Sequence, residues 1–221
     1  GKHVVYSTYC GSTKNKTFNA RLIESDIKHY FISNNEDVLI SAEKKGWVPY
    51  FLDLPVYDNL IYSSWQAKIA KAMPHIFPFI ENYQYSMYLD DKLNFDVNLL
   101  SNYEGILTCE DAAMALREHD FLKSNVLAEF SEAMKHKRYF VLRERTINYI
   151  SSEIESGYSL RAKRVWWTSA IFRNMRHREI KEINQAWYLK ILNCGINCQI
   201  SFDFLAQNYS SISVLPQKIE I

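Results

Sequence analysis

The chain has 221 residues, of which 48% are hydrophobic, and its net charge is +1. This length and hydrophobicity suffice for one sizeable core, so we expect a single domain over residues 1–221 rather than a disordered chain. A net charge this close to zero, without a dense basic stripe, argues against nucleic acid as a partner.

The cysteines indicate a reducing compartment, and the hydropathy pattern predicts no membrane-spanning helix. Four cysteines form no disulfide framework, and the close pair Cys194 and Cys198 lacks a second pair to complete a zinc site. No apolar stretch reaches the roughly 18 residues that a transmembrane helix needs. We therefore expect a cytoplasmic protein without a transmembrane segment, which can be one domain of a longer polypeptide.

In the first half, the pattern predicts three strands followed by one clear helix. Residues 4–9, 28–32 and 47–52 have strand pattern, and residues 33–37 have turn chemistry. Residues 63–73 suit a helix that Pro74 ends. Strands separated by a helix predict an α/β fold with a mainly parallel sheet.

The next strand ends in two carboxylates. Residues 85–89 are apolar and aromatic, and Asp90 and Asp91 follow directly. Adjacent like charges are costly inside a strand, so we expect them at its C-terminal edge, where open α/β sheets bind ligands. There they suit a hard cation such as Mg²⁺ or Mn²⁺. A solvated Asp-Asp turn is the alternative.

The glycines exclude two familiar nucleotide sites. The six Gly stand too far apart for either a GxGxxG fingerprint or a Walker A loop. Residues 11–16 form a polar loop after the first strand, which suits either a base or ribose contact or an ordinary connection.

The second half predicts more helix. Residues 106–108 have the composition of a short strand. Helices are expected over residues 120–138, 147–158 and 180–192, with a strand over 168–173, and the tail 210–221 is weakly patterned.

At this point the motifs resemble a known family. Lys71, Pro74, His75, Phe77 and Pro78 come shortly before the run Tyr85, Ser86, Asp90, Lys92 and Leu93. Their order resembles the Lys-x-x-Pro-His-x-x-Phe-Pro and Tyr-Ser-x-x-Asp-x-Lys-Leu signature of a glycosyltransferase-like family of plants and bacteria. This chain has one residue fewer between His75 and Phe77, and one more between Ser86 and Asp90, than that signature. Most of the chain is also similar to chlorella-virus glycosyltransferase domains that build capsid glycans.

The resemblance implies a GT-A fold, with residues 1–100 as the nucleotide-binding half and 101–221 as the acceptor-side half. It implies a UDP-sugar donor, a glycan or glycoprotein acceptor, and Mn²⁺ or Mg²⁺ held by Asp90, Asp91 and a later His, for which His177 is the candidate. The implied nucleotide and diphosphate contacts are Thr8, Tyr9, Cys10, Gly11, Asn34, Lys68, Lys71 and Asp90.

The catalytic residue is less well defined. The resemblance implies an Asp-Gln pair in the late helix, where this chain has Asn184 and Gln185. An amide cannot act as a general base, so an inverting or a retaining reaction stays open. We take Asp91, Glu182 and Gln185 as the catalytic candidates, with Glu110, Asp111 and Glu179 as alternatives. Two other functions remain: an inactive nucleotide-sugar binding module, favoured by Asn184, and a nucleotidyltransferase.

Overall fold

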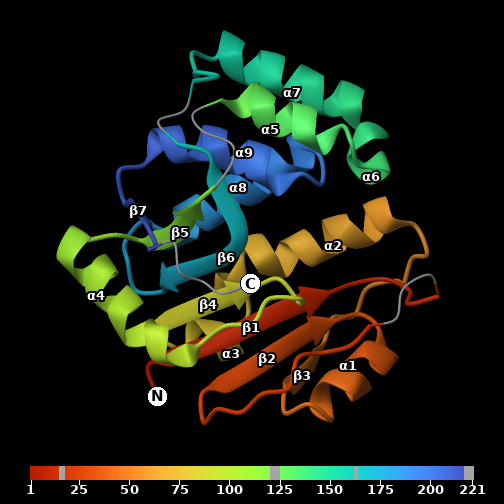
Figure 1. Ribbon diagram of the computed structural model, residues 1–221, viewed down its shortest axis with the longest axis vertical. Coiled ribbons are helices and arrows are strands. Elements are labelled where there is room, and N and C mark those ends of the chain that lie inside the picture. Colours follow the sequence, from red (N-terminus) through yellow and green to blue (C-terminus); the bar gives the residue numbers. More distant parts are fainter. Residues whose placement is uncertain (15–17, 120–124, 162–163, 217–221) are drawn as a thin grey trace.

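The computed structural model describes residues 1–14, 18–119, 125–161 and 164–216, and a seven-stranded sheet forms its centre (Figure 1). The order across the sheet is β3-β2-β1-β4-β6-β5-β7. Strand β6 runs antiparallel to both of its neighbours, and all other neighbouring strands are parallel. The strands are β1 (His3–Tyr9), β2 (Lys28–Ser33), β3 (Val48–Phe51), β4 (Tyr85–Leu89), β5 (Met114–Glu118), β6 (Trp166–Asn174) and β7 (Ile212–Val214).

Helices cover both faces of this sheet. The α-helices of the described residues are α1 (Glu36–Glu43), α2 (Leu60–Ala72), α3 (Pro78–Glu81), α4 (Leu100–Glu110), α5 (Val126–Ala133), α6 (Lys137–Phe140), α7 (Arg143–Glu155), α8 (Ile180–Cys194) and α9 (Cys198–Leu205). Helices α2 and α8 pack on one face, and α1 and α4 on the other. Helices α5 and α7 form a further layer against α9, at the top of Figure 1.

The alternation of side chains along β4 explains how one strand serves both cores. All five residues of β4 are buried. Tyr88 points into the core under α2 and α8, whereas Tyr85, Met87 and Leu89 point into the core under α4. Each large apolar side chain buried in this way contributes about 1.5–3 kcal/mol. The strand is therefore fixed in register, and its C-terminal end is held in a defined position.

Most of the predicted elements are confirmed, with small differences at their ends. The prediction of a mainly parallel α/β sheet is correct. The confirmed strands are those expected over 4–9, 28–32, 47–52, 85–89 and 168–173, and the confirmed helices those over 63–73, 147–158 and 180–192.

Four predictions differ from the structure. Residues 106–108 belong to α4 and not to a strand. The helix expected over 120–138 is divided into α5 and α6, because His136 is extended, and residues 120–124 lie outside the described residues. The expected turn at 33–37 is instead a helix start, where the Asn35 side chain accepts a hydrogen bond from the Asp37 amide. The tail contributes β7, while residues 217–221 lie outside the described part.

The structure also adds β5 and α9, which the sequence did not predict, and both lie close to the site described below. In the described part of the chain, no helix has the length and hydropathy required to cross a bilayer. All four cysteines are unpaired.

Candidate active site

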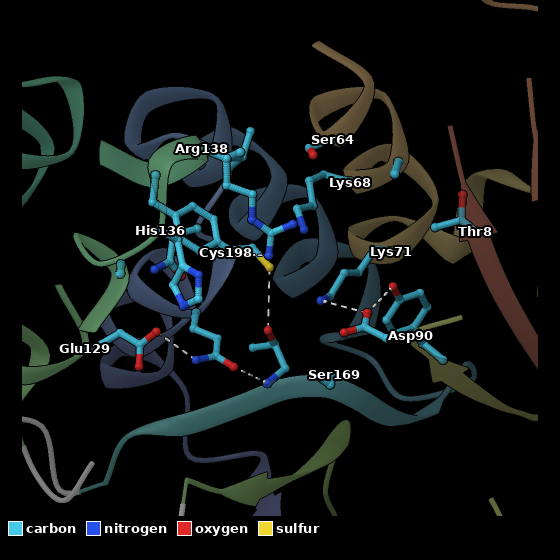
Figure 2. Close-up of a pocket in the computed structure, with 18 of the residues that line it drawn as sticks. Thr8, Ser64, Lys68, Lys71, Asp90, Glu129, His136, Arg138, Ser169 and Cys198 are labelled. Atoms are coloured by element: carbon cyan, nitrogen blue, oxygen red, sulfur yellow. Dashed lines mark hydrogen bonds and ion pairs between the residues drawn. The ribbon is translucent and has the colours of Figure 1, made fainter. Parts of the chain in front are cut away.

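A cavity of about 790 Å³ opens where β1 and β4 end (Figure 2). The chain passes from β1 to β2 on one side and reaches β4 on the other, so this is the point at which strand order reverses. Ligands of open α/β sheets bind at such a switch point. Five residues predicted from sequence lie around the cavity: Thr8, Lys68, Lys71, Asp90 and Asp91.

Asp90 is held by β6 and by α2. Its amide donates a hydrogen bond to the Ser169 carbonyl at 2.8 Å. Its Oδ1 accepts a hydrogen bond from the Tyr88 hydroxyl at 2.6 Å and forms an ion pair with Lys71 Nζ at 3.4 Å. Burial raises the pKa of Asp90, but Lys71, Lys68 and Tyr88 together outweigh burial and leave the pKa below its ordinary value. The carboxylate is therefore charged at neutral pH.

Two lysines of α2 present positive charge to the same cavity. Lys68 and Lys71 are three residues apart, so they lie on one face of the helix. The Lys71 side chain is only 5% exposed, and its ammonium lies 5.1 Å from the centre of the Tyr88 ring. Burial lowers the pKa of Lys71, but Asp90 and Cys198 outweigh it and the pKa is raised, whereas burial lowers the pKa of Lys68. Lys68 and Lys71 therefore bring two ammonium groups to the cavity that Asp90 borders.

The donor groups around Asp90 fit a divalent cation that is bound together with a phosphate. Asp90 and Asp91 both border the cavity. Among the residues that the structure describes, no group of three or more His, Cys, Asp or Glu side chains is suited to hold a metal. Mg²⁺ at phosphates is usually held by one or two carboxylates, with phosphate and water oxygens completing its shell, and Mn²⁺ accepts the same ligand types. Asp90 and Asp91 therefore suit a metal ion that a diphosphate also binds, rather than a metal ion held by protein side chains alone.

The loop after β1 is tightly built. Gly11 has a φ of +105°, and a Cβ at this position would lie 2.6 Å from Ser63 Cβ. Its amide donates to Asn34 Oδ1 at 2.9 Å, and its carbonyl accepts from Asn35 Nδ2 at 3.0 Å. Only glycine fits this position without strain. Residues 15–17 of the loop lie outside the described residues.

Of the predicted nucleotide contacts in this region, one borders the cavity, and the side chains of the others are buried or bonded within the loop. Thr8 borders the cavity. Asn34 is 2% exposed, and its amide also donates to the Pro55 carbonyl and to Gln66, so its side chain supports the loop rather than facing a ligand. Cys10 is buried, and burial raises the pKa of its thiol to about 11. Tyr9 donates its hydroxyl to the Ser12 carbonyl. Of the contacts predicted in β1 and the loop after it, Thr8 alone borders the cavity, and both backbone groups of Gly11 are bonded to Asn34 and Asn35.

His177 does not join the Asp pair, contrary to the prediction. Strand β6 is antiparallel to β4, and its last residue, Asn174, pairs with Tyr85 at the start of β4. His177 therefore lies at the opposite edge of the sheet from Asp90. There its Nε2 lies 3.1 Å from the Asp111 carbonyl, and its Nδ1 accepts a hydrogen bond from the Glu179 amide.

The same reversal separates the late-helix candidates from the cavity. Glu182 and Gln185 are exposed in the first turns of α8, and Glu182 accepts a hydrogen bond from the Tyr209 hydroxyl at 2.9 Å. Asn184 is fully buried and accepts a hydrogen bond from Arg173 Nε at 3.0 Å. None of these three residues borders the cavity. The alternatives Glu110, Asp111 and Glu179 lie outside it as well.

Residues that the sequence did not single out complete the walls. Strand β6 breaks register with β5, because Leu116 pairs with Ile171 but Arg117 pairs with Trp167. The intervening residues bulge, and Thr168 and Ser169 of this bulge line the cavity. The other walls add Glu129 from α5, Arg138 and Tyr139 from α6, and Cys198 and Gln199 from α9. Glu129 stood in a predicted helix, but nothing in its spacing distinguished it from a solvated charge.

Comparison with known proteins identifies the fold. No protein-family model matches the chain, and no curated protein matches its sequence. The structure is similar to the crystal structure of mouse xyloside xylosyltransferase 1 in its apo form, with a TM-score of 0.53 and 10% identity over 96% of this chain and 84% of that one. The X-ray structure of the mannosyltransferase Ktr4p from S. cerevisiae matches with a TM-score of 0.43 and 12% identity, over 97% of this chain and 68% of that one. The first match shows that the chain has the fold of a glycosyltransferase.

Proposed function

We propose that this protein is a metal-dependent glycosyltransferase that moves a sugar from a UDP-sugar to a hydroxyl of a glycan or glycoprotein acceptor. The observation that carries the proposal is the cavity at the strand switch point, where Asp90 and Asp91 face Lys68 and Lys71. A fold shared with a xylosyltransferase supports the same reaction class.

Transfer from a nucleotide sugar requires stabilisation of the departing diphosphate. Asp90 and Asp91 would hold Mn²⁺ or Mg²⁺, which supplies positive charge to the diphosphate when bound. Lys71, which is paired with Asp90, and Lys68 of the same helix supply further positive charge to the cavity. The ion pair of Lys71 with Asp90 keeps both groups charged and in place, so little reorganisation is needed when the diphosphate departs.

The nucleoside would lie along the loop after β1, next to Thr8 and the backbone of Cys10 and Gly11. The sugar would point toward β6, α5 and α9, which form the opposite wall of the cavity. A role in building viral capsid glycans within the host cytoplasm follows from the resemblance of the motifs alone and is part of this proposal.

A UDP-release assay tests the proposal. Wild-type protein is incubated with a panel of UDP-sugars and Mn²⁺, with and without free saccharides as acceptors. We expect UDP release that falls about 100-fold or more in Asp90→Asn and Asp91→Asn, because a carboxylate that binds the metal contributes several kcal/mol to the transition state. Excess EDTA should abolish it. Asp53→Asn, an exposed position outside the cavity, serves as control and should keep wild-type activity.

Three outcomes would contradict parts of the proposal. Release that is unchanged by EDTA would exclude the metal. UDP-sugar binding without release, for every donor and acceptor tried, would favour a binding module. Consumption of UTP and a sugar 1-phosphate with release of pyrophosphate would favour a nucleotidyltransferase.

A further inference from the structure

Glu129 is a buried carboxylate with one oxygen that no described residue satisfies. It lies on α5 and is 6% exposed, and it borders the cavity (Figure 2). Its Oε1 accepts a hydrogen bond from Gln199 Nε2 at 2.8 Å. Its Oε2 has no hydrogen-bond partner among the described residues.

An unsatisfied buried carboxylate oxygen is costly for the folded protein. Burial raises the pKa of Glu129, although Gln199, His119 and Asn197 each lower it, which reflects the same cost. The buried Glu153 avoids this cost, because it is paired with Lys190 at 2.7 Å. Asp203 Oδ2 likewise has no partner among the described residues, but Asp203 lies outside this cavity. The cost at Glu129 falls on a residue that faces the cavity, where a ligand can relieve it.

Gln199 holds Glu129 at a defined place relative to Asp90. The Gln199 Oε1 accepts a hydrogen bond from the Thr168 amide at 3.3 Å, and the neighbouring residue Ser169 accepts one from the Asp90 amide. The Gln199 side chain thus connects Glu129 to the bulge of β6, one residue away from the partner of Asp90. In Figure 2, Glu129 lies to the left and Asp90 to the right, both on the same side of this segment of β6.

We propose that Glu129 Oε2 accepts a hydrogen bond from a hydroxyl of the transferred sugar, which makes Glu129 a residue that selects the donor sugar. This inference rests on the proposed function, because it assumes a diphosphate at Asp90. The sugar of a nucleotide sugar is bonded directly to the β-phosphate, so it must occupy the part of the cavity next to Asp90. A carboxylate accepts hydrogen bonds and donates none, which suits a hydroxyl and not a second anion.

Binding measurements with paired ligands test this. Affinities for UDP and for UDP-glucose, UDP-galactose and UDP-xylose are measured by calorimetry, in the presence of Mn²⁺, for wild type, Glu129→Ala and Glu129→Gln. We expect UDP to bind all three proteins within about twofold. The UDP-sugar that binds wild type most tightly should lose roughly tenfold or more in Glu129→Ala, as expected for a hydrogen bond to a charged group. Glu129→Gln keeps the bond to Gln199 and should lose less.

A series of deoxy sugars distinguishes a direct contact between Glu129 and the sugar from a purely structural role of Glu129. For the monodeoxy analogue that lacks the contacted hydroxyl, wild type should lose roughly tenfold or more in affinity, and Glu129→Ala should lose nothing further. Glu155→Ala, an exposed position on α7 outside the cavity, should resemble wild type throughout.

Two results would overturn the inference, and they differ. If wild type binds UDP-sugars but Glu129→Ala has the same ratio of UDP-sugar to UDP affinity, Glu129 does not contact the sugar while the proposed function stands. If wild type binds neither UDP nor any UDP-sugar, the proposed function itself fails.

Discussion

Replacing Gly11 by alanine should destabilise the protein more than the same change at any glycine that only needs a positive φ. Gly11 has a φ of +105°, which costs a residue with a Cβ about 1–2 kcal/mol. The new Cβ would also lie 2.6 Å from Ser63 Cβ and 3.1 Å from the Tyr57 carbonyl. Overpacking of this kind costs about 1–3 kcal/mol, so Gly11→Ala should lower the free energy of unfolding by about 2–5 kcal/mol.

Two other glycines separate the cost of a positive φ from the cost of overpacking. Gly157 has a φ of +97°, but no atom of the described residues lies within 4 Å of the place that a Cβ would take, so Gly157→Ala should show the backbone cost alone, about 1–2 kcal/mol. Gly105 lies inside α4 with open space around it, and Gly105→Ala should stabilise the protein by about 0.5–1 kcal/mol.

Urea denaturation followed by circular dichroism measures all three variants. The Gly11 variant should also weaken UDP binding, because its loop continues from Thr8 at the cavity, whereas Gly157→Ala should leave UDP affinity unchanged. Equal destabilisation by Gly11→Ala and Gly157→Ala would refute the reasoning, since it would mean that Ser63 and Tyr57 do not confine Gly11.

Two further predictions concern titratable groups. Burial raises the pKa of Asp203 well above its ordinary value, so the folded protein retains a proton that the unfolded chain releases. Its contribution to stability is therefore full below about pH 4 and is lost as the pH rises toward the raised pKa. Asp203→Asn keeps the acceptor for the Trp166 amide but cannot ionise. In urea unfolding, its gain in stability over wild type should therefore be larger at about pH 7.5 than at about pH 4.5. An equal gain at both pH values would contradict this. At Cys198, burial raises the pKa of the thiol, but Lys68 and Lys71 outweigh burial and lower it. Iodoacetamide should therefore modify Cys198, and UDP with Mn²⁺ should protect it. Exposed Cys109 should react equally in both conditions, and peptide mapping by mass spectrometry that finds no protection at Cys198 would contradict the prediction.

The first strands and the Asp pair were accessible from sequence because local rules decide them. A buried apolar run followed by two carboxylates can only place the charges at the strand end, and the structure has Asp90 there. Lys68 and Lys71 came from the resemblance and from their place in the helix before the Asp strand, and in the structure both lie on one face of α2.

Strand direction was not accessible in the same way. Residues 168–173 have clear strand composition, but composition does not say whether a strand runs parallel or antiparallel to its neighbour. The antiparallel course of β6 sends His177 to the far edge of the sheet and brings Thr168 and Ser169 to the cavity. Without the direction of β6, the sequence could not show that Thr168 and Ser169, rather than His177, lie near Asp90.

Helix α9 was missed because it lacks an amphipathic period. Seven of its eight residues are buried, including Ser201 and Asp203, so its sequence shows no polar stripe. Glu129 was missed because a charged residue in a helix is most often solvated, and only the packing of α5 against α9 removes it from water.

The pairing of β4 with β6 also sets the order in which the site can be assembled. Tyr85 pairs with Asn174 and Leu89 with Ala170, so the contacts between β6 and the segment that carries Asp90 join residues about eighty positions apart. Closing so long a loop is slow compared with forming local helices. During synthesis from the N-terminus, β1 to β4 are all available before β6 emerges, and β4 remains an unpaired edge until then. The cavity thus takes shape late in folding, and a shortened chain that ends before β6 would carry the Asp pair on an open sheet edge, where aggregation competes with ligand binding.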